Sequence, residues 1–351
     1  MDARPTDGNV YKLLRISAIR DEAHDVKTFI FEPLDNEILY TSGQFLTFAF
    51  NHHHKEERRS FSISSSPILA EPLSITLKRI ENGAYSRLLI DRAQVGDILY
   101  TTGAAGLFTL PADIANRKQL FFLAAGIGIT PIFSLLKTAL HEYPHIQIVL
   151  IYSNRNSKET VFYNELVALE KQFPGRLRIE LLFSNAFNLS RARLSKWLLP
   201  TLINEYATVA KEDILYYICG PFTYMRMAII SLQEQGVPDA NIRKENFDTV
   251  VAIPHTLPPD TEPHQVTLNM QGKQYNFTVQ YPQSILQAAK KLHIPIPYSC
   301  ETGRCGSCTA LCTTGTVWLS YNEVLTDADL AAGKALTCTG YPVKGNIKLE
   351  I

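Results

Sequence analysis

The sequence predicts a multi-domain fold, in which an antiparallel β-barrel is followed by a doubly wound α/β domain and by a small C-terminal domain. Short runs of alternating polarity, typical of strands in a small barrel, fill residues 8–112. Apolar strands alternate with helical stretches across residues 113–248, as in a doubly wound parallel sheet. Most of the 6 cysteines fall between positions 300 and 338, inside the third region, residues 264–351. A chain of 351 residues has room for two or three domains.

Composition narrows the class of protein. The 34 basic and 34 acidic residues cancel, so nothing favours a nucleic-acid partner, which usually needs a basic excess. A hydrophobic content of 46% is ordinary for a folded chain and excludes disorder as the main state. The longest apolar stretch, near Leu120–Ile129, is much shorter than the roughly 20 residues of a membrane helix. The first residues, MDARPTDGNV, do not resemble a signal peptide, so we expect a soluble, cytoplasmic protein without a membrane partner.

The first region is expected to hold five strands and one helix. The strands are Val26–Phe31, Gln44–Phe50, Arg59–Ser64, Leu73–Ile80 and Asp97–Thr101. The helix covers Tyr85–Arg92, where Gly83 opens it and the chain turns at Gly96. Between two of these strands, His52-His53-His54 can be taken for a metal tract, but its charged neighbours favour a solvated loop.

The second region is expected to hold four strands and four helices. The strands are Gln119–Ala125, Ile146–Tyr152, Leu177–Phe183 and Ile214–Cys219, and the helices are Pro131–Glu142, Thr160–Phe173, Leu194–Glu205 and Phe222–Gln235. Thr130 is predicted to cap a helix that has Pro131 at its first position, and Pro221 is expected to begin a helix in the same way. Gly236 marks a helix end.

A proline-rich connector, residues 249–263, is expected to be stiff and extended. The third region follows it over residues 264–351. Strands Gln265–Met270 and Gln274–Gln280 form a predicted hairpin, and a helix capped by Ser284 covers Ile285–Leu292.

The cysteine spacing is the most specific signal in the sequence. Cys300, Cys305, Cys308 and Cys338 follow the C-x4-C-x2-C…C pattern of a plant-type [2Fe–2S] cluster. Small residues in the loop let several sulfurs and backbone N–H groups converge on one cluster. The alternative is a structural zinc site, but zinc ribbons use two C-x2-C pairs and only one is present. Cys312 is either a further ligand or, more often for such a thiol, a small packed hydrophobe.

The stretch PIPYSCETGRCGSC resembles the loop of plant-type ferredoxins. This resemblance implies that residues 264–351 form a β-grasp sheet with one main helix.

Arg59-Ser60-Phe61-Ser62 resembles the R-x-Y-S motif of the ferredoxin–NADP reductase superfamily. The resemblance implies that Arg59 pairs with a flavin phosphate, that an aromatic ring lies along the flavin, and that Ser62 reaches flavin N5. Phe61 replaces the family's tyrosine, which keeps the stacking and loses the phenol hydrogen bond. The alternative for so short a motif is a plain strand.

Two further motifs keep the family's order. Gly83-x-x-Ser86 opens a helix after the strand that contains Thr76 and Lys78, and the start of a helix suits a pyrophosphate. The segment 103–108, GAAGLF, resembles the family's G-P-x-G-x-F turn with alanine in place of proline. By this resemblance the first region binds a flavin, with FAD favoured over FMN.

The segment 124–131, AAGIGITP, resembles the family's A-G-G-x-G-I-T-P. Gly126 and Gly128 let the backbone approach a dinucleotide whose pyrophosphate faces the helix start. The alternative is an ordinary strand-to-helix turn. The resemblance implies that Thr130, followed by Pro131, lies near the nicotinamide.

Cys219-Gly220-Pro221 resembles the family's C-G-P, where the cysteine flanks the nicotinamide; the alternative for Cys219 is a buried core thiol. Ser62, Thr130 and Cys219 are therefore the predicted catalytic residues.

Coenzyme preference is read from the residues after the second strand of the α/β region. Ser153 and Arg155 stand where NAD-specific folds carry a carboxylate, which favours NADPH over NADH. The alternative for Arg155 is a solvated side chain. Phe247 is expected to cover the flavin, although a core phenylalanine fits equally.

Together, the three regions resemble a three-domain reductase that moves electrons from NADPH through FAD and a [2Fe–2S] cluster to a partner oxygenase or another redox protein. Within the superfamily the sequence resembles the reductases that serve phenylacetyl-CoA oxygenases (epoxidases). The alternatives are a reductase of another oxygenase, a general donor to electron carriers, a slowly turning redox sensor, and a ferredoxin fused to an inert domain.

Overall fold

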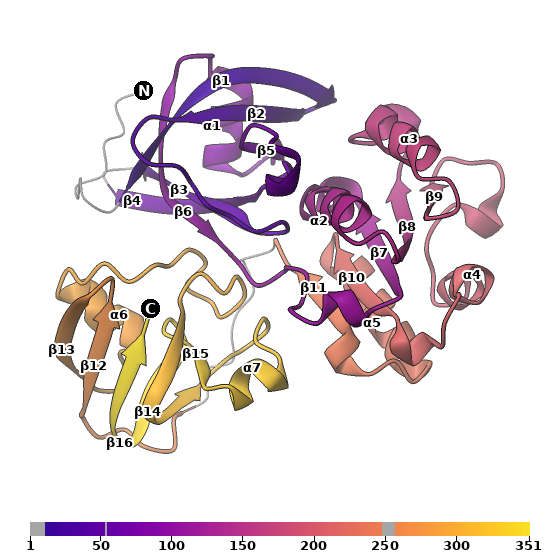
Figure 1. The fold of residues 1–351 in the computed structure, drawn as a ribbon. Coiled ribbons are helices and arrows are strands. Elements are labelled where there is room, and N and C mark those ends of the chain that lie inside the picture. The colour runs from indigo at the N-terminus through magenta and orange to yellow at the C-terminus, as the bar shows by residue number, and fades with distance from the viewer. Residues whose placement is uncertain (1–10, 53–54, 248–256) are drawn as a thin grey trace. The chain divides into compact units, whose positions relative to one another are not determined.

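A computed structural model describes residues 11–52, 55–247 and 257–351 (Figure 1). The chain divides into two compact units, one ending at Phe247 and the other beginning at Asp248. The first unit contains two sheets and the second contains one. Residues 8–10, His53, His54 and positions 249–256 of the predicted connector lie outside the described residues.

The N-terminal sheet of the first unit is an antiparallel barrel. Its strands are β1 Lys12–Ala23, β2 Val26–Pro33, β3 Phe45–His52, β4 Lys55–Ser62, β5 Ser74–Lys78 and β6 Ile98–Ala105, in the order β4-β3-β6-β1-β2-β5. A bridge between Ile63 and Ile75 joins the two ends of this order and closes the sheet. Helix α1, Ala84–Arg92, packs on the barrel core through Tyr85 and Leu89.

Strand β1 is absent from the strands predicted for this region, although it is 12 residues long. Only Leu14 and Ile16 of this strand are fully buried, and the rest of it is partly or fully exposed. The strand therefore has too short an alternating run to be recognised, and its pairing with β2 and β6 holds it in place.

The second sheet is parallel, in agreement with the predicted doubly wound fold. Its strands are β7 Gln119–Ala125, β8 Gln147–Asn154, β9 Leu177–Phe183, β10 Leu215–Cys219 and β11 Ile242–Glu245, in the order β11-β10-β7-β8-β9. The helices are α2 Ile129–Glu142, α3 Tyr163–Gln172, α4 Leu198–Tyr206 and α5 Phe222–Glu234. The first strand of this sheet, β7, lies in its middle. The chain then adds β8 and β9 on one side of β7 and afterwards β10 and β11 on the other side, so the strand order reverses between β7 and β10.

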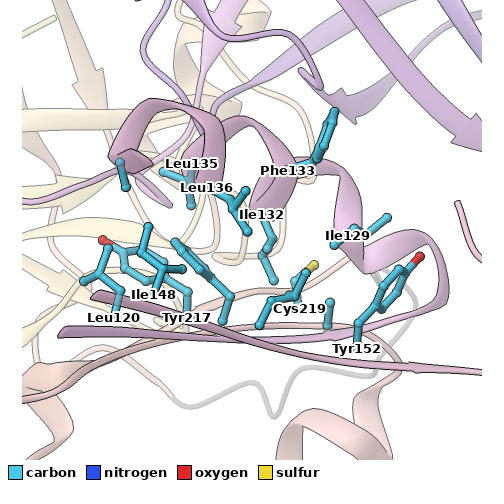
Figure 2. Packing of buried hydrophobic residues seen from close by; sticks show 14 of the residues in the cluster. Leu120, Ile129, Ile132, Phe133, Leu135, Leu136, Ile148, Tyr152, Tyr217 and Cys219 are labelled. Carbon is cyan, nitrogen blue, oxygen red and sulfur yellow. The ribbon is translucent and has the colours of Figure 1, made fainter. Parts of the chain in front are cut away.

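Helices cover both faces of this sheet. On one face, Leu120, Ile148 and Tyr217 pack beneath α2, as Figure 2 shows. On the other face, Phe121, Tyr216 and Ile218 pack with residues of α4 and α5. Neighbouring residues of a strand point to opposite faces, so these strands are apolar at nearly every position.

The helix starts differ from the prediction in several places. α3 begins at Tyr163 and not at Thr160, and α4 begins at Leu198 and not at Leu194. The turn Gly126–Gly128 is 3-10 helical and runs directly into α2, whose N-cap is Gly128. Thr130 is therefore inside the helix, where its hydroxyl donates to the carbonyl of Ile127 at 3.0 Å. Pro221 is the N-cap of α5 and not its first residue.

The second unit holds a mixed five-stranded sheet. Its strands are β12 His264–Met270, β13 Lys273–Val279, β14 Thr309–Leu319, β15 Lys334–Leu336 and β16 Gly340–Glu350, in the order β13-β12-β16-β14-β15. Helix α6, Ile285–Lys291, begins with a capping box between Ser284 and Gln287 and buries its apolar side on the sheet. A shorter helix, α7, covers Asp327–Ala331. Residues 257–263 of the predicted connector lie in this unit, where Asp260 accepts hydrogen bonds from His264 and from the Lys344 backbone.

Candidate functional site

Two glycine turns meet where the strand order of the parallel sheet reverses. A Cβ atom on Gly128 would lie 2.3 Å from the carbonyl oxygen of Cys219, and one on Gly220 would lie 3.0 Å from the Cβ of Ala125. Glycine therefore lets the turn after β7 pack directly against the turn after β10. Crevices at such a reversal point, outside the carboxyl ends of the strands, are the usual ligand sites of open α/β sheets.

The barrel and the parallel sheet meet at this edge through a hydrogen bond. The Ser62 hydroxyl, at the end of β4, donates to Oε2 of Glu245 at 3.0 Å. Glu245 ends β11 and lies beside Cys219 in the parallel register. Burial raises the pKa of Glu245 to about 8, and the hydrogen bond from Ser62 opposes this shift. An acid that holds its proton near neutral pH therefore lies beside the predicted flavin-facing serine. Sequence reasoning did not identify this acid.

Cys219, predicted to flank the nicotinamide, has a fully buried side chain. Figure 2 shows Cys219 pointing from the sheet toward Ile129 and Ile132 of α2. Burial, and secondly the charge of Glu245, raise the pKa of the thiol, so it remains protonated. Full burial fits the core thiol given above as the alternative, and the role beside the nicotinamide stays a prediction. Thr130 is also buried, with its hydroxyl bonded to the backbone.

A cleft of about 470 Å³ lies at the same edge of the parallel sheet. Its lining includes Ser153, Asn154, Arg193, Pro221 and Tyr224. Within the described residues, Ser153 Oγ and Asn154 Nδ2 are buried without a hydrogen-bond partner of ordinary geometry. Buried polar atoms of this kind need a partner, so the cleft fits a polar ligand such as a nucleotide.

Arg155, the predicted phosphate ligand, does not line this cleft. Its side chain is 75% exposed and lies 3.9 Å from the carboxylate of Glu159. Arg193 is instead the arginine that lines the cleft together with Ser153. It follows the strand β9 and was not identified from the sequence.

The flavin motif lies along β4 on the barrel. Arg59 is half exposed, and its guanidinium donates to Glu57 at 2.8 Å and to the carbonyl of Arg58. The ring of Phe61 lies 6.0 Å from that of Tyr85, nearly parallel to it, and Ser60 hydrogen-bonds to Thr47 at 2.8 Å. A flavin phosphate at Arg59 has to compete with Glu57 for the guanidinium.

The predicted pyrophosphate turn lies before α1. Gly83 is the N-cap, and a Cβ there would lie 2.5 Å from the Ser86 hydroxyl. That hydroxyl accepts from the Ile80 backbone and donates to the Gly83 carbonyl, so Ser86 shapes the turn. Because none of the described side chains caps α1, the N–H groups of its first turn remain available to an anion.

Thr76 and Lys78, the predicted cofactor-binding residues on the strand before this turn, differ in burial. The Thr76 hydroxyl is buried and bonded to Thr28 and Ser64, whereas Lys78 is exposed. Phe247, predicted to cover the flavin, is 44% exposed at the end of the first unit.

A polar seam fixes the barrel against α2. The Thr138 hydroxyl contacts those of Ser42, at 2.5 Å, and Ser66, at 2.8 Å. Ser134 donates to the carbonyl of Ser65 at 2.6 Å, and Lys137 pairs with the carboxylate of Glu71. This seam holds the Ser62 end of β4 at the reversal point of the parallel sheet.

In the second unit, the four cysteines approach one another in pairs. The sulfurs of Cys308 and Cys338 lie 3.2 Å apart. A hydrogen bond from Cys305 is the main cause that lowers the pKa of Cys300, and Cys338 lowers that of Cys308 in the same way. Among the described residues, no three side chains surround a single-ion position. Two pairs of thiols are what a cluster of two irons requires, with two thiolates for each metal.

The loop that carries three of these cysteines supplies further donors. The Thr302 backbone N–H donates to the sulfur of Cys300 at 3.4 Å. The hydroxyl of Thr302 is buried, and the described residues offer it no partner of ordinary geometry. Gly303 and Gly306 have positive φ angles, which fold the loop tightly. The donor set therefore fits an anionic cluster. Cys312 contacts backbone carbonyls of Thr314 and Gly315.

In the part of the chain that the structure describes, no helix has the length and apolar character needed to cross a membrane.

Comparison with protein families assigns each of the three domains. Residues 13–110 match the family described as "Oxidoreductase FAD-binding domain". Residues 122–229 match "Oxidoreductase NAD-binding domain", and residues 268–343 match "2Fe-2S iron-sulfur cluster binding domain". The chain therefore belongs to the reductases of the ferredoxin–NADP reductase type that carry a C-terminal [2Fe–2S] domain. It is an NAD(P)H oxidoreductase that uses FAD and a [2Fe–2S] cluster.

Several relatives are similar along nearly the whole chain. The "3-ketosteroid-9-alpha-monooxygenase, ferredoxin reductase component" of Rhodococcus rhodochrous is 29% identical, with 96% of each chain covered. One of the subunits of the 1,2-phenylacetyl-CoA epoxidase of Escherichia coli K12 is 28% identical, again with 96% of each covered. The solved structure of phthalate dioxygenase reductase has the same fold, with a TM-score of 0.58, 22% identity, and 97% of this chain and 98% of that chain covered.

Proposed function

We propose that this reductase transfers electrons from NADPH, through FAD and the [2Fe–2S] cluster, to the oxygenase component of a multicomponent oxygenase. The observation that carries the proposal is the joint presence of two sites in one chain. The first is the reversal-point site with Ser62 and Glu245, and the second is the set of paired cysteines in the C-terminal unit. Relatives named as components of oxygenase systems support the kind of partner.

The protein's contribution to the reaction is mainly positioning and exclusion of water. When bound, the flavin accepts a hydride and the cluster carries single electrons. Gly128 and Gly220 bring the two turns together, and the cleft beside Ser153 and Arg193 orients the nucleotide. Ser62 holds the carboxyl group of Glu245 at the same edge, so that a proton is available there. Thr130 and Cys219 supply a buried wall behind this edge.

We further propose NADPH as the preferred coenzyme. The support is the absence of a carboxylate at Ser153-Asn154-Arg155 and the presence of Arg193 on the cleft. Replacement of Arg193 by alanine is expected to raise KM for NADPH and to leave KM for NADH unchanged. The control is Lys196→Ala, since Lys196 lies over Trp197 and outside the cleft lining. A ratio of kcat/KM for NADPH to that for NADH below one in the wild type would contradict the proposal.

The proposed partner is the oxygenase of a phenylacetyl-CoA epoxidase, and the proposed process is phenylacetate catabolism. The support is the relative that is 28% identical, while a ketosteroid monooxygenase relative at 29% makes another oxygenase a second candidate. Purified reductase should be combined with each oxygenase, and product formed per NADPH consumed should be measured. Coupled product formation with the ketosteroid enzyme and none with the epoxidase would favour the second candidate. A cytoplasmic location belongs to this proposal, because cysteines that ligate iron must stay reduced.

The turnover rate distinguishes an enzyme from a redox sensor that turns over slowly. Enzymes typically turn over at about 1–10³ s⁻¹. Turnover with ferricyanide slower than about one per minute would favour the sensor.

A further inference from the structure

An ion pair joins the cluster loop to the segment that follows β14, and the proposed function does not use it. Arg304 directly precedes Cys305, and its side chain is only 3% exposed. Its Nε lies 2.8 Å from Oε2 of Glu323, whose side chain is 15% exposed. Arginine and glutamate are seldom buried to this extent unless they are paired, because removing their charges from water is costly.

The segment that carries Glu323 is attached to both halves of the cysteine site. The Glu323 backbone N–H donates to the carbonyl of Gly303 at 3.0 Å, in the loop between Cys300 and Cys305. The Thr339 hydroxyl, one residue after Cys338, donates to the carbonyl of Tyr321 at 2.8 Å. The segment thus connects the loop with the turn between β15 and β16, which supplies the last cysteine.

Arg304 is held from a second side by Tyr321. Its Nη2 donates to the phenol oxygen at 3.4 Å, and its guanidinium carbon lies 5.6 Å from the ring centroid. The Arg304 backbone N–H also donates to the sulfur of Cys300. Glu323 and Tyr321 therefore hold the guanidinium in a buried position, on the residue that directly precedes the cluster ligand Cys305.

We propose that Arg304 and Glu323 are a positioning and tuning pair that sets the reduction potential of the cluster held by the four cysteines. Reduction adds one negative charge to the cluster. A fixed positive charge nearby favours the reduced form, and a fixed negative charge disfavours it. In a buried site these effects are weakly screened by water and salt. Arg304 therefore raises the potential, Glu323 lowers it, and their pairing fixes the balance.

This inference rests on the proposed cysteine ligands, and four variants test it. They are Arg304→Met, Glu323→Gln, the double variant and Arg304→Lys. The cluster's midpoint potential is measured by anaerobic redox titration followed by electron paramagnetic resonance, which reads the cluster without catalytic turnover. Arg304→Met is expected to lower the potential and Glu323→Gln to raise it. Each of these two substitutions is expected to change the equilibrium constant for reduction of the cluster about tenfold, which corresponds to a shift of ~59 mV in the midpoint potential for one electron. The double variant and Arg304→Lys should lie near the wild type.

The chain offers a matched control beside the same loop. Lys290 pairs with Glu301, which directly follows Cys300, at 2.9 Å, but these side chains are 38% and 41% exposed. Because water and salt screen exposed charges, Lys290→Met and Glu301→Gln should shift the potential much less, and added salt should reduce that shift. The shifts of the Arg304 and Glu323 variants should persist in salt.

A merely structural role for the pair makes a different prediction. Both single variants would then lose cluster content or shift the potential in the same direction, and that result would overturn the proposal. If Arg304→Met does not retain a cluster, Glu323→Gln and Arg304→Lys still test the proposal. A fall in the potential of Glu323→Gln, or no change in it, contradicts the proposal. A wild-type protein without any cluster signal would instead defeat the proposed function.

Discussion

The carboxyl group of Glu245 at the reversal point gives a sharp test of the first unit. Burial raises the pKa of Glu245 from 4.5 to about 8. Because the folded-state pKa lies above the unfolded one, the stability that goes with the proton is fully present below about pH 4.5. It is lost progressively as the pH rises toward 8. Replacing Glu245 by glutamine keeps the shape and removes the titration.

The size of the effect follows from linkage. Between the two pKa values, the folded state binds about one proton more than the unfolded state, and one pKa unit corresponds to about 1.4 kcal/mol. From about pH 6 to about pH 8, the wild type should lose up to about 2.5 kcal/mol of stability at this site. Glu245→Gln should not lose this part.

The assay measures the free energy of unfolding of the first unit in the full chain. Thermal and urea unfolding are followed at about pH 6 and about pH 8. The stability of Glu245→Gln relative to the wild type should rise between these two values. Glu234→Gln, at an exposed position near the end of α5, is the matched control and should follow the wild type. Equal pH dependence of Glu245→Gln and the wild type would refute the reasoning.

Three further outcomes are expected. Ser62→Ala removes the hydrogen bond that favours the ionised carboxylate, so the pH at which stability falls should move upward, and a downward move would contradict this. Gly128→Ala forces a Cβ to within 2.3 Å of the Cys219 carbonyl oxygen, which should cost about 1–3 kcal/mol and weaken nucleotide binding, as calorimetry can check. Thr138→Val leaves the buried hydroxyls of Ser42 and Ser66 without their shared partner and should cost about 1–3 kcal/mol in urea unfolding, whereas an unchanged midpoint would show that the seam is not stabilising.

Local patterns predicted the central strands well, and for a physical reason. The ranges of β7 and β9 agree with the prediction at both ends. β7 is fully buried, so its apolar run ends where the sheet ends. The half-exposed strand β1 and the short edge strand β11 lack such an apolar run. Their extended conformation depends on hydrogen-bonded pairing with neighbouring strands.

The candidate site was only partly predictable for a similar reason. The glycines and Ser62 belong to motifs that are compact in the sequence. The contact between Ser62 and Glu245 joins residues 183 positions apart, and no local pattern shows it. Arg193 and the Arg304–Glu323 pair likewise depend on which loops the fold brings together.

The order of electron transfer tests the account most directly. Wild-type protein and a Cys308→Ala variant should be mixed anaerobically with NADPH, while flavin absorbance and the cluster's paramagnetic signal are followed in time. We predict that the flavin bleaches in both proteins and that the cluster signal appears afterwards in the wild type only. A cluster signal that precedes flavin bleaching, or one that survives in Cys308→Ala, would contradict the account.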